Sequence, residues 1–137
     1  MRWIYDDGGR AAAGFVGDAG DCVTRAIAIA TGMDYRAVYD DLSERQAALG
    51  KPRSARNGVQ PKAYKPYLAE LDAIWTPTMS IGSGTTVHLR ECELPYEPWL
   101  IVRLSKHLAA IRQGVVYDTH DPSRDGTRAV YGYWHVR

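Results

Sequence analysis

The spacing of apolar residues changes near Ala73, and this change constrains the fold more than any other feature of the chain. Between about residues 22 and 72, apolar side chains recur every three or four positions, which is typical of amphipathic helices. From about residue 73 to residue 137 they occur in short runs separated by turn-forming residues, as in β-strands. This order predicts a single α+β domain over residues 1–137, with helices packed on a C-terminal antiparallel sheet.

The first helix is expected to begin at Cys22. Asp21 is a candidate N-cap and Gly32 a candidate residue for ending the helix in a left-handed conformation. The apolar positions at helical spacing are Val23, Ala26, Ile27 and Ala30. A cysteine is therefore predicted at the first position of a short, buried helix.

Two further helices should follow. Asp34 can cap a helix that runs through Leu49, and another is expected from Pro61 to about Leu71. Pro66 should kink or shorten the latter, because a proline removes a backbone donor and crowds the preceding turn.

The second half contains four clear strand candidates and one unassigned stretch. Residues 78–94 are expected to form a loop with one short strand or turn. The strand candidates are Trp99 to Leu104, His107 to Ile111, Gly114 to Asp118 and Tyr131 to Val136. Arg112, Gln113 and Gly114 separate two of these runs, which predicts a hairpin.

Cys22, His107 and Asp118 form a candidate catalytic triad. A thiol at a helix N-terminus is near unpaired N–H groups and the positive end of the helix dipole, which favour a thiolate. His107 opens one strand of the predicted hairpin and Asp118 closes the other, so antiparallel pairing should bring both to one end of the sheet. His107 could then take the thiol proton while Asp118 orients the ring. A buried structural role for Cys22 is the alternative.

Three other polar residues, Asp21, Arg25 and Asp121, are candidate binding residues. Asp121 competes with Asp118 for the third triad position, but Asp-Pro is more often part of a turn, so Asp118 is preferred. Arg25 follows Cys22 by one helical turn and could pair with Asp18, Asp21 or a substrate, although we expect it to be solvent-exposed.

The order of these residues resembles that of the papain-like cysteine peptidase superfamily. KHLAAIRQGVVYDTHDP is similar to the histidine-to-aspartate region of leader peptidases fused to bacteriocin exporters. MRWIYDDGGR, GDCVTRAIAIATG, SARNGV and YDTHDPSR together resemble a group of uncharacterised phage and bacterial proteins. The first resemblance implies a papain-like fold and a cysteine hydrolase that acts through a covalent thioester on a peptide or protein. The second implies a phage or bacterial setting and brings no activity with it.

One position departs from the papain-like pattern. Papain-like enzymes usually place a glutamine a few residues before the cysteine to stabilise the oxyanion, whereas FVGDAGD contains neither glutamine nor asparagine. Arg10, Tyr5 or a backbone N–H could replace it, and the loss of one donor typically costs about 3 kcal/mol of transition-state stabilisation. Two alternatives remain open: a weak or inactive binding module that captures a host protein or a small metabolite, and an acyl transferase of the transglutaminase type.

The charge balance and the spacing of particular residues bear on partners, location and cofactors. Lys and Arg number 17 against 16 Asp and Glu, so no strong field attracts nucleic acid or an anionic membrane. Neither a signal peptide nor a membrane-spanning run is apparent, and a cytoplasmic protein with reduced Cys22 and Cys92 is expected. Neither Cys-x-x-Cys nor His-x-x-x-His spacing occurs, so we expect no metal, and the proposed chemistry requires no cofactor.

Overall fold

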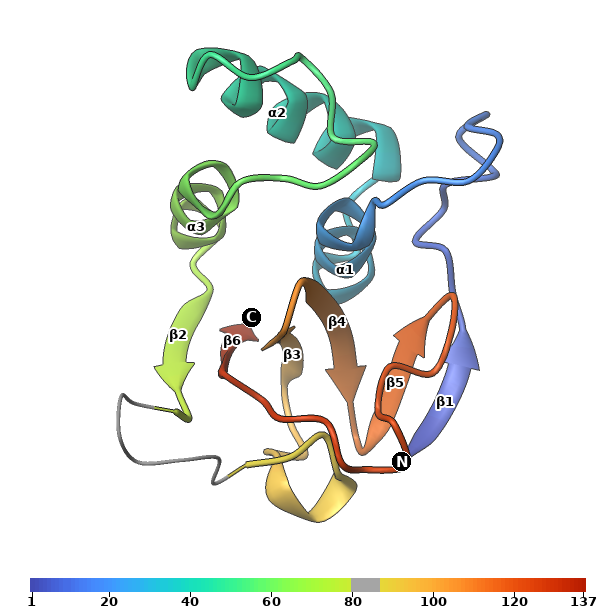
Figure 1. Cartoon of the computed structure of the whole chain (residues 1–137), viewed down its shortest axis with the longest axis vertical. Coiled ribbons are helices and arrows are strands. Elements are labelled where there is room, and N and C mark those ends of the chain that lie inside the picture. The colour runs from blue at the N-terminus through green and yellow to red at the C-terminus, as the bar shows by residue number, and fades with distance from the viewer. Residues whose placement is uncertain (80–86) are drawn as a thin grey trace.

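The computed structural model describes residues 1–79 and 87–137, which form an α+β fold with three helices packed on a mixed sheet (Figure 1). The helices are α1 (Cys22–Thr31), α2 (Tyr35–Ala48) and α3 (Pro61–Glu70). The strands are β1 (Arg2–Tyr5), β2 (Ile74–Pro77), β3 (Trp99–Leu104), β4 (His107–Arg112), β5 (Val115–Asp118) and β6 (Gly132–Val136). A short 3-10 helix, η1, spans Glu91–Glu93. Part of the loop expected at residues 78–94 lies outside the described residues.

The strands are ordered β1-β5-β4-β3-β6-β2 across the sheet. All neighbouring pairs are antiparallel except β1 and β5, which run parallel. The prediction of a purely antiparallel, C-terminal sheet was therefore wrong at one edge, where the N-terminus of the chain contributes β1. All four residues of β1 are exposed, so they lack the alternation of buried and exposed positions by which a strand is recognised.

The helix ends follow the local signals of the sequence. Asp34 caps α2 by accepting a hydrogen bond from the N–H of Ala37, and Gly32 ends α1 with a left-handed φ of 73°. Pro61 occupies the first turn of α3, where its missing N–H costs nothing. The helix continues to Glu70 despite Pro66, so this internal proline does not end it.

Two apolar clusters lie on opposite faces of the sheet. The helices cover one face, where Ile27, Val38 and Leu68 pack with Ile101 and Trp134. The other face carries Leu100, Val102, Ile111 and Val116, which pack with Leu89 and Val130 from the connecting loops. Because α1 packs directly against β4, the first residue of the helix lies close to the first residue of the strand. Within the described residues, no helix has both the length and the apolar character needed to cross a membrane.

Candidate active site

Cys22 is the first residue of α1 and is partly buried. The side chain of Asp21, the N-cap residue, does not cap the helix, so the first N–H groups lack the usual carboxylate acceptor. Burial alone would raise the pKa of the Cys22 thiol. Hydrogen bonding to His107, the charge of its imidazole, the Leu108 N–H and the charge of Arg25 together outweigh burial and lower the pKa. These groups therefore stabilise the thiolate form of Cys22 against the effect of burial.

His107 and Asp118 meet at one end of the β4–β5 hairpin. The pairing of Ala110 with Tyr117 places Asp118 beside the beginning of β4, and the Nε2 of His107 lies 2.6 Å from Oδ2 of Asp118. This bond leaves Nδ1 of the ring available to Cys22. Burial opposes the charged imidazole, but hydrogen bonds to Asp118 and Cys22, with their negative charges, raise the pKa of His107 to about 9. The proximity predicted from the hairpin is present.

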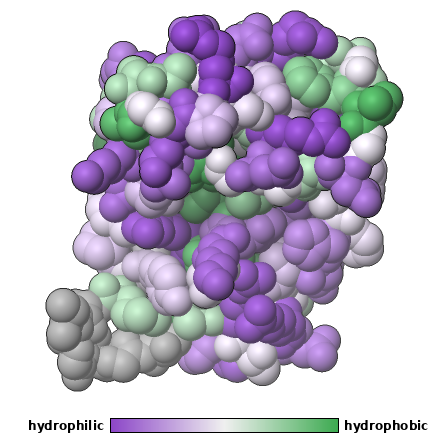
Figure 2. All heavy atoms as spheres, turned by 45° about the horizontal axis from the view of Figure 1, so that its top comes forward, coloured by the Kyte–Doolittle hydropathy of each residue, from purple (hydrophilic) through white to green (hydrophobic). Residues whose placement is uncertain are grey.

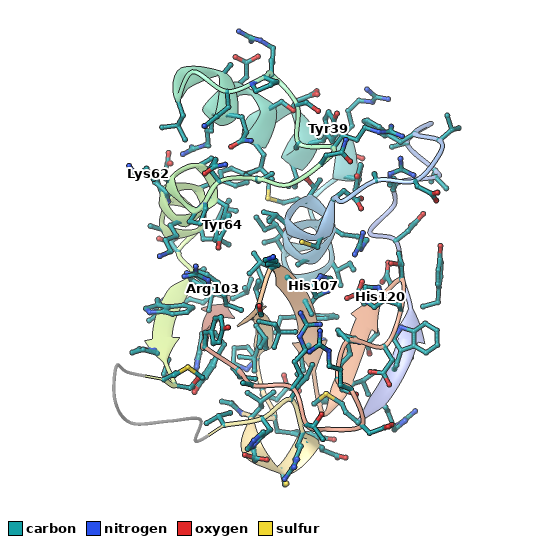
Figure 3. The ribbon with its side chains drawn as sticks, viewed as in Figure 1. Tyr39, Lys62, Tyr64, Arg103, His107 and His120 are labelled. Carbon is teal, nitrogen blue, oxygen red and sulfur yellow. The ribbon has the colours of Figure 1, made fainter. Side chains whose placement is uncertain are left out.

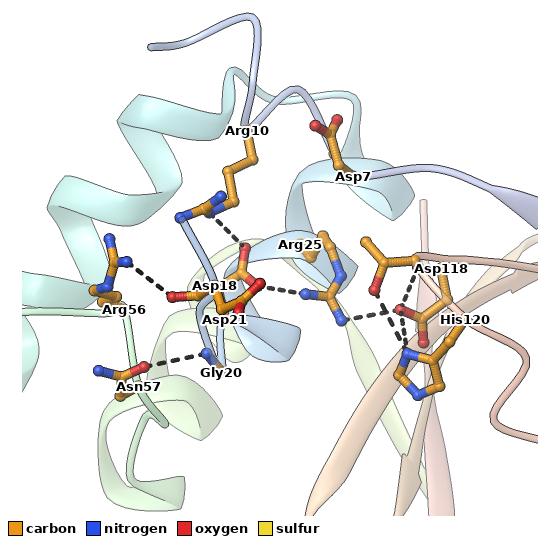
Figure 4. A network of polar contacts seen from close by, with 12 residues as sticks. Asp7, Arg10, Asp18, Gly20, Asp21, Arg25, Arg56, Asn57, Asp118 and His120 are labelled. Carbon is orange, nitrogen blue, oxygen red and sulfur yellow. Dashed lines mark hydrogen bonds and ion pairs between the residues drawn. The ribbon is translucent and has the colours of Figure 1, made fainter. Parts of the chain in front are cut away.

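Arg25 joins the two acidic residues of the site (Figure 4). Its Nη2 donates to Oδ1 of Asp118 at 2.9 Å, and its Nη1 donates to Oδ1 of Asp21. The expectation of a solvent-exposed arginine was wrong, because only 8% of the Arg25 side chain is accessible. Burial makes this double pairing necessary, since an isolated charge would be costly to remove from water.

Asp21 is held by further groups around its buried carboxylate. The hydroxyl of Tyr35 donates to Oδ2 of Asp21 at 2.6 Å, and Nε of Arg10 lies 3.7 Å from the same oxygen. The preceding loop is also fixed, because the N–H of Gly20 donates to Oδ1 of Asn57 and the carbonyl of Gly20 accepts a hydrogen bond from the N–H of Gly58. Asp21 thus anchors the segment before Cys22, rather than capping α1 with its side chain.

Asp118, rather than Asp121, contacts the imidazole. Asp121 is exposed, and its Oδ1 accepts the N–H of Ser123, as expected for an aspartate in a turn. Asp118 is buried and accepts hydrogen bonds from His107, Arg25 and the N–H of Thr119. Its backbone carbonyl accepts the indole N–H of Trp3, so β1 supports the end of β5.

A pocket of about 500 Å³ opens beside Cys22 and His107. Its other lining residues come from α1, the segment before α3, α3, β3, the β3–β4 turn, β4 and the segment before β6. They are Val23, Gly58, Val59, Pro61, Tyr64, Arg103, Leu104, Ser105, Lys106, Leu108 and Tyr131. Figure 3 shows Tyr64 and Arg103 on the side of α3, and His107 below α1. In Figure 2, a hollow in the middle of the displayed face has an apolar floor and a hydrophilic rim.

His107, Asp118 and His120 lie close enough together to be considered as metal ligands. His120 is exposed, and its ring centroid lies 5.2 Å from that of His107. However, the oxygens of Asp118 already accept three hydrogen bonds, one of them from the buried cation of Arg25. A metal ion would have to displace these donors beside a fixed positive charge, so the grouping fits proton transfer better than metal binding.

Two of the expected oxyanion donors lie elsewhere. Arg10 donates to the carbonyl of Val16 and pairs with Asp21, and 65% of Tyr5 is exposed on the edge strand β1. Neither residue lines the pocket. The backbone N–H groups at the start of α1 are therefore the donors that the site offers to a developing oxyanion.

Sequence reasoning missed three residues around the site. Tyr35 supports Asp21 through its hydroxyl, while Tyr64 and Arg103 line the pocket. Tyr35 resembled an ordinary first residue of a helix, and Arg103 interrupted the apolar run WLIVRL. That interruption was the one available signal, since a cation within a buried strand needs a reason.

Comparison of the chain with protein-family models, curated proteins and solved structures finds no match.

Proposed function

We propose that this protein is a papain-like cysteine hydrolase that acts on an amide, isopeptide or related acyl bond of a peptide or protein. The observation that carries the proposal is the placement of one imidazole between a thiol at a helix N-terminus and a buried carboxylate. The three residues have the roles that nucleophilic catalysis requires: Cys22 attacks, His107 transfers protons and Asp118 orients the ring.

In the first step, the Cys22 thiolate attacks the acyl carbon and the carbonyl oxygen becomes an oxyanion. The N–H groups at the start of α1 stabilise that charge. When the carbon–nitrogen bond breaks, the imidazolium of His107 gives its proton to the departing amine, and a thioester remains on Cys22. The hydrogen bond to Asp118 and its negative charge keep His107 protonated until this transfer.

In the second step, water attacks the thioester. His107, now neutral, accepts a proton from the water, and the carbon–sulfur bond breaks to release a carboxylic acid. The proton on the imidazole restores the thiolate–imidazolium pair. No metal or organic cofactor takes part in either step.

One observation favours the binding module as a second candidate. The loop before Cys22 has no amide side chain, and Arg10 and Tyr5 do not replace it at the pocket. A pocket with an activated thiol but a poor oxyanion site would capture a host protein or small metabolite without efficient turnover. Acyl transfer is the third candidate, because it uses the same residues and differs only in replacing water by an amine.

An activated ester distinguishes the three candidates. We suggest p-nitrophenyl acetate with a Cys92→Ser protein, so that the exposed second cysteine does not react. A hydrolase should release p-nitrophenolate in a burst equal to the amount of Cys22, followed by steady turnover, and Cys22→Ala should lose both. A burst without turnover would support the binding module, and turnover accelerated by glycine amide would support acyl transfer. Absence of a burst would contradict an activated Cys22.

A further inference from the structure

The charged residues that line the pocket are all basic. Arg103 lies on β3, and Lys106 lies in the turn that leads to His107. Among residues 1–79 and 87–137, no aspartate or glutamate lines the pocket. The imidazolium of His107 is balanced by the Cys22 thiolate, so the net positive charge of the pocket comes from Arg103 and Lys106 and should attract anions and repel cations.

Arg103 differs from most other arginines of the described chain in having no polar partner for its side chain. It lies two positions from Ile101 on β3, and therefore on the face that the helices cover. Arginines 25, 45, 53, 90 and 112 pair with carboxylates, and arginines 36, 56 and 128 donate to backbone carbonyls. Among residues 1–79 and 87–137, nothing equivalent satisfies the guanidinium of Arg103.

Tyr64 adds a second polar group beside Arg103. Its ring is buried, with 5% of the residue accessible, and it packs edge-on against Trp134. Both residues line the same pocket, where burial raises the pKa of Tyr64 and the positive charge of Arg103 opposes that rise. The hydroxyl has no hydrogen-bond partner among the described residues, so it remains available to a ligand.

We propose that Arg103, with the Tyr64 hydroxyl beside it, recognises a carboxylate of the substrate. This inference rests on the proposed function and names its substrate class: acyl compounds that carry an acidic group near the bond attacked by Cys22. A guanidinium and a carboxylate form charge-assisted hydrogen bonds in matched geometry. The largely apolar lining lowers the local dielectric constant, which strengthens this pairing over one on an open surface.

Two chloroacetamides of nearly equal shape test the preference in the Cys92→Ser protein. N-chloroacetylglutamic acid α-amide and N-chloroacetylglutamine amide differ only in a side-chain carboxylate or carboxamide. In each, the Cys22 thiolate displaces chloride and forms a thioether. The quantity measured is the second-order rate constant for the glutamate probe divided by that for the glutamine probe. General changes in thiol reactivity affect both rate constants equally and cancel in this ratio.

Arg103→Gln should lower the ratio by about tenfold, which is the effect expected from the loss of one charge-assisted hydrogen bond. Arg103→Lys should retain most of the preference, and Lys51→Gln, which removes an exposed lysine that does not line the pocket, should leave it unchanged. N-chloroacetylglutamine with a free α-carboxylate tests a terminal acid as the source of the charge. For each carboxylate probe, the rate constant is divided by that of N-chloroacetylglutamine amide. If Arg103→Gln leaves this ratio unchanged from the Cys92→Ser protein, for both the side-chain and the α-carboxylate probe, the inference is overturned.

Failure of the proposed function would look different. If neither probe labels Cys22, the hydrolase is contradicted, and the carboxylate preference is then measured by binding alone. N-acetylglutamic acid α-amide and N-acetylglutamine amide can be titrated into Cys22→Ala protein and followed by NMR. Tighter binding of the glutamate compound that Arg103→Gln abolishes would support the carboxylate site without any reaction. Equal binding of the two compounds would overturn it.

Discussion

The imidazole Nε2 of His107 lies 2.6 Å from Oδ2 of Asp118, at the end of a hairpin in which His107 begins β4 and Asp118 ends β5. The other oxygen of Asp118, Oδ1, accepts a hydrogen bond from Nη2 of Arg25 at 2.9 Å, so the carboxylate connects the imidazole to the helix that carries Cys22. The reacting groups are thus positioned by the contact between α1 and the sheet. Substitutions around this contact should therefore change the pKa of His107 or the stability of the fold.

Asp118→Asn should lower the pKa of His107 from about 9 by at least about one unit, because it removes the negative charge that favours the imidazolium. The ring would lose its proton at lower pH, and the alkaline limit of activity should move down with it. NMR titration of the His107 ring measures the change. Asp121→Asn is the matched control and should leave the pKa of His107 unaltered, since the Asp121 carboxylate accepts a hydrogen bond within its own turn, from the N–H of Ser123. An equal shift in both variants would contradict the assignment.

Arg25→Met should destabilise the fold by about 3–5 kcal/mol, because it leaves the buried carboxylates of Asp21 and Asp118 without their shared cation. Arg53→Met is the control: the Arg53–Glu44 pair is more than half exposed, so its loss should cost at most about 1 kcal/mol. Urea denaturation gives both free energies of unfolding. Similar costs for the two variants would mean that the Asp21–Arg25–Asp118 network contributes little.

Tyr35→Phe should cost about 1–3 kcal/mol of stability, because Asp21 loses a buried donor at 2.6 Å. Tyr39→Phe removes a weaker bond, at 3.3 Å to Ser54, and should cost less. Thermal denaturation of the two variants compares them directly. A Tyr39→Phe protein less stable than Tyr35→Phe would be evidence against a special role for the Asp21 carboxylate.

Gly8→Ala should loosen the loop that packs on α1. A Cβ at this position would lie 3.2 Å from the carbonyl oxygen of Arg25, and φ is +72°. Gly14 also has a positive φ, of +91°, but a Cβ there would meet nothing within 4 Å. Both alanine variants should lose about 1–2 kcal/mol of unfolding free energy because of the left-handed backbone. Only Gly8→Ala should lose more, because of its contact with Arg25. Equal losses in unfolding free energy would show that this contact is unimportant.

Local signals in the sequence predicted much of the fold. Helical spacing and capping residues placed α1 and α2, and the short apolar runs placed β3 to β6. The position of Cys22 at a helix start followed from Asp21 and the spacing of Val23, Ala26 and Ile27. The proximity of His107 and Asp118 followed from the hairpin, because two strands joined by a short turn have a predictable pairing.

Features that depend on distant contacts were not predictable in this way. Trp3 bonds to Asp118, 115 positions away, and nothing in the exposed residues of β1 indicates this pairing. Arg25 resembles a solvent-exposed helix residue until the end of β5 is known to face it. Arg103 likewise gains significance only when the pocket beside Cys22 is seen.

The pH dependence of Cys22 alkylation by iodoacetamide, in a Cys92→Ser background, tests the thiolate–imidazolium pair most directly. The rate should rise through an apparent pKa below the usual thiol value of about 8.5, because His107 and Arg25 stabilise the thiolate against burial. His107→Gln should move that pKa upward and slow the reaction at neutral pH by about tenfold or more. A thiol that titrates at the ordinary value, and is indifferent to the loss of His107, would contradict the proposed active site.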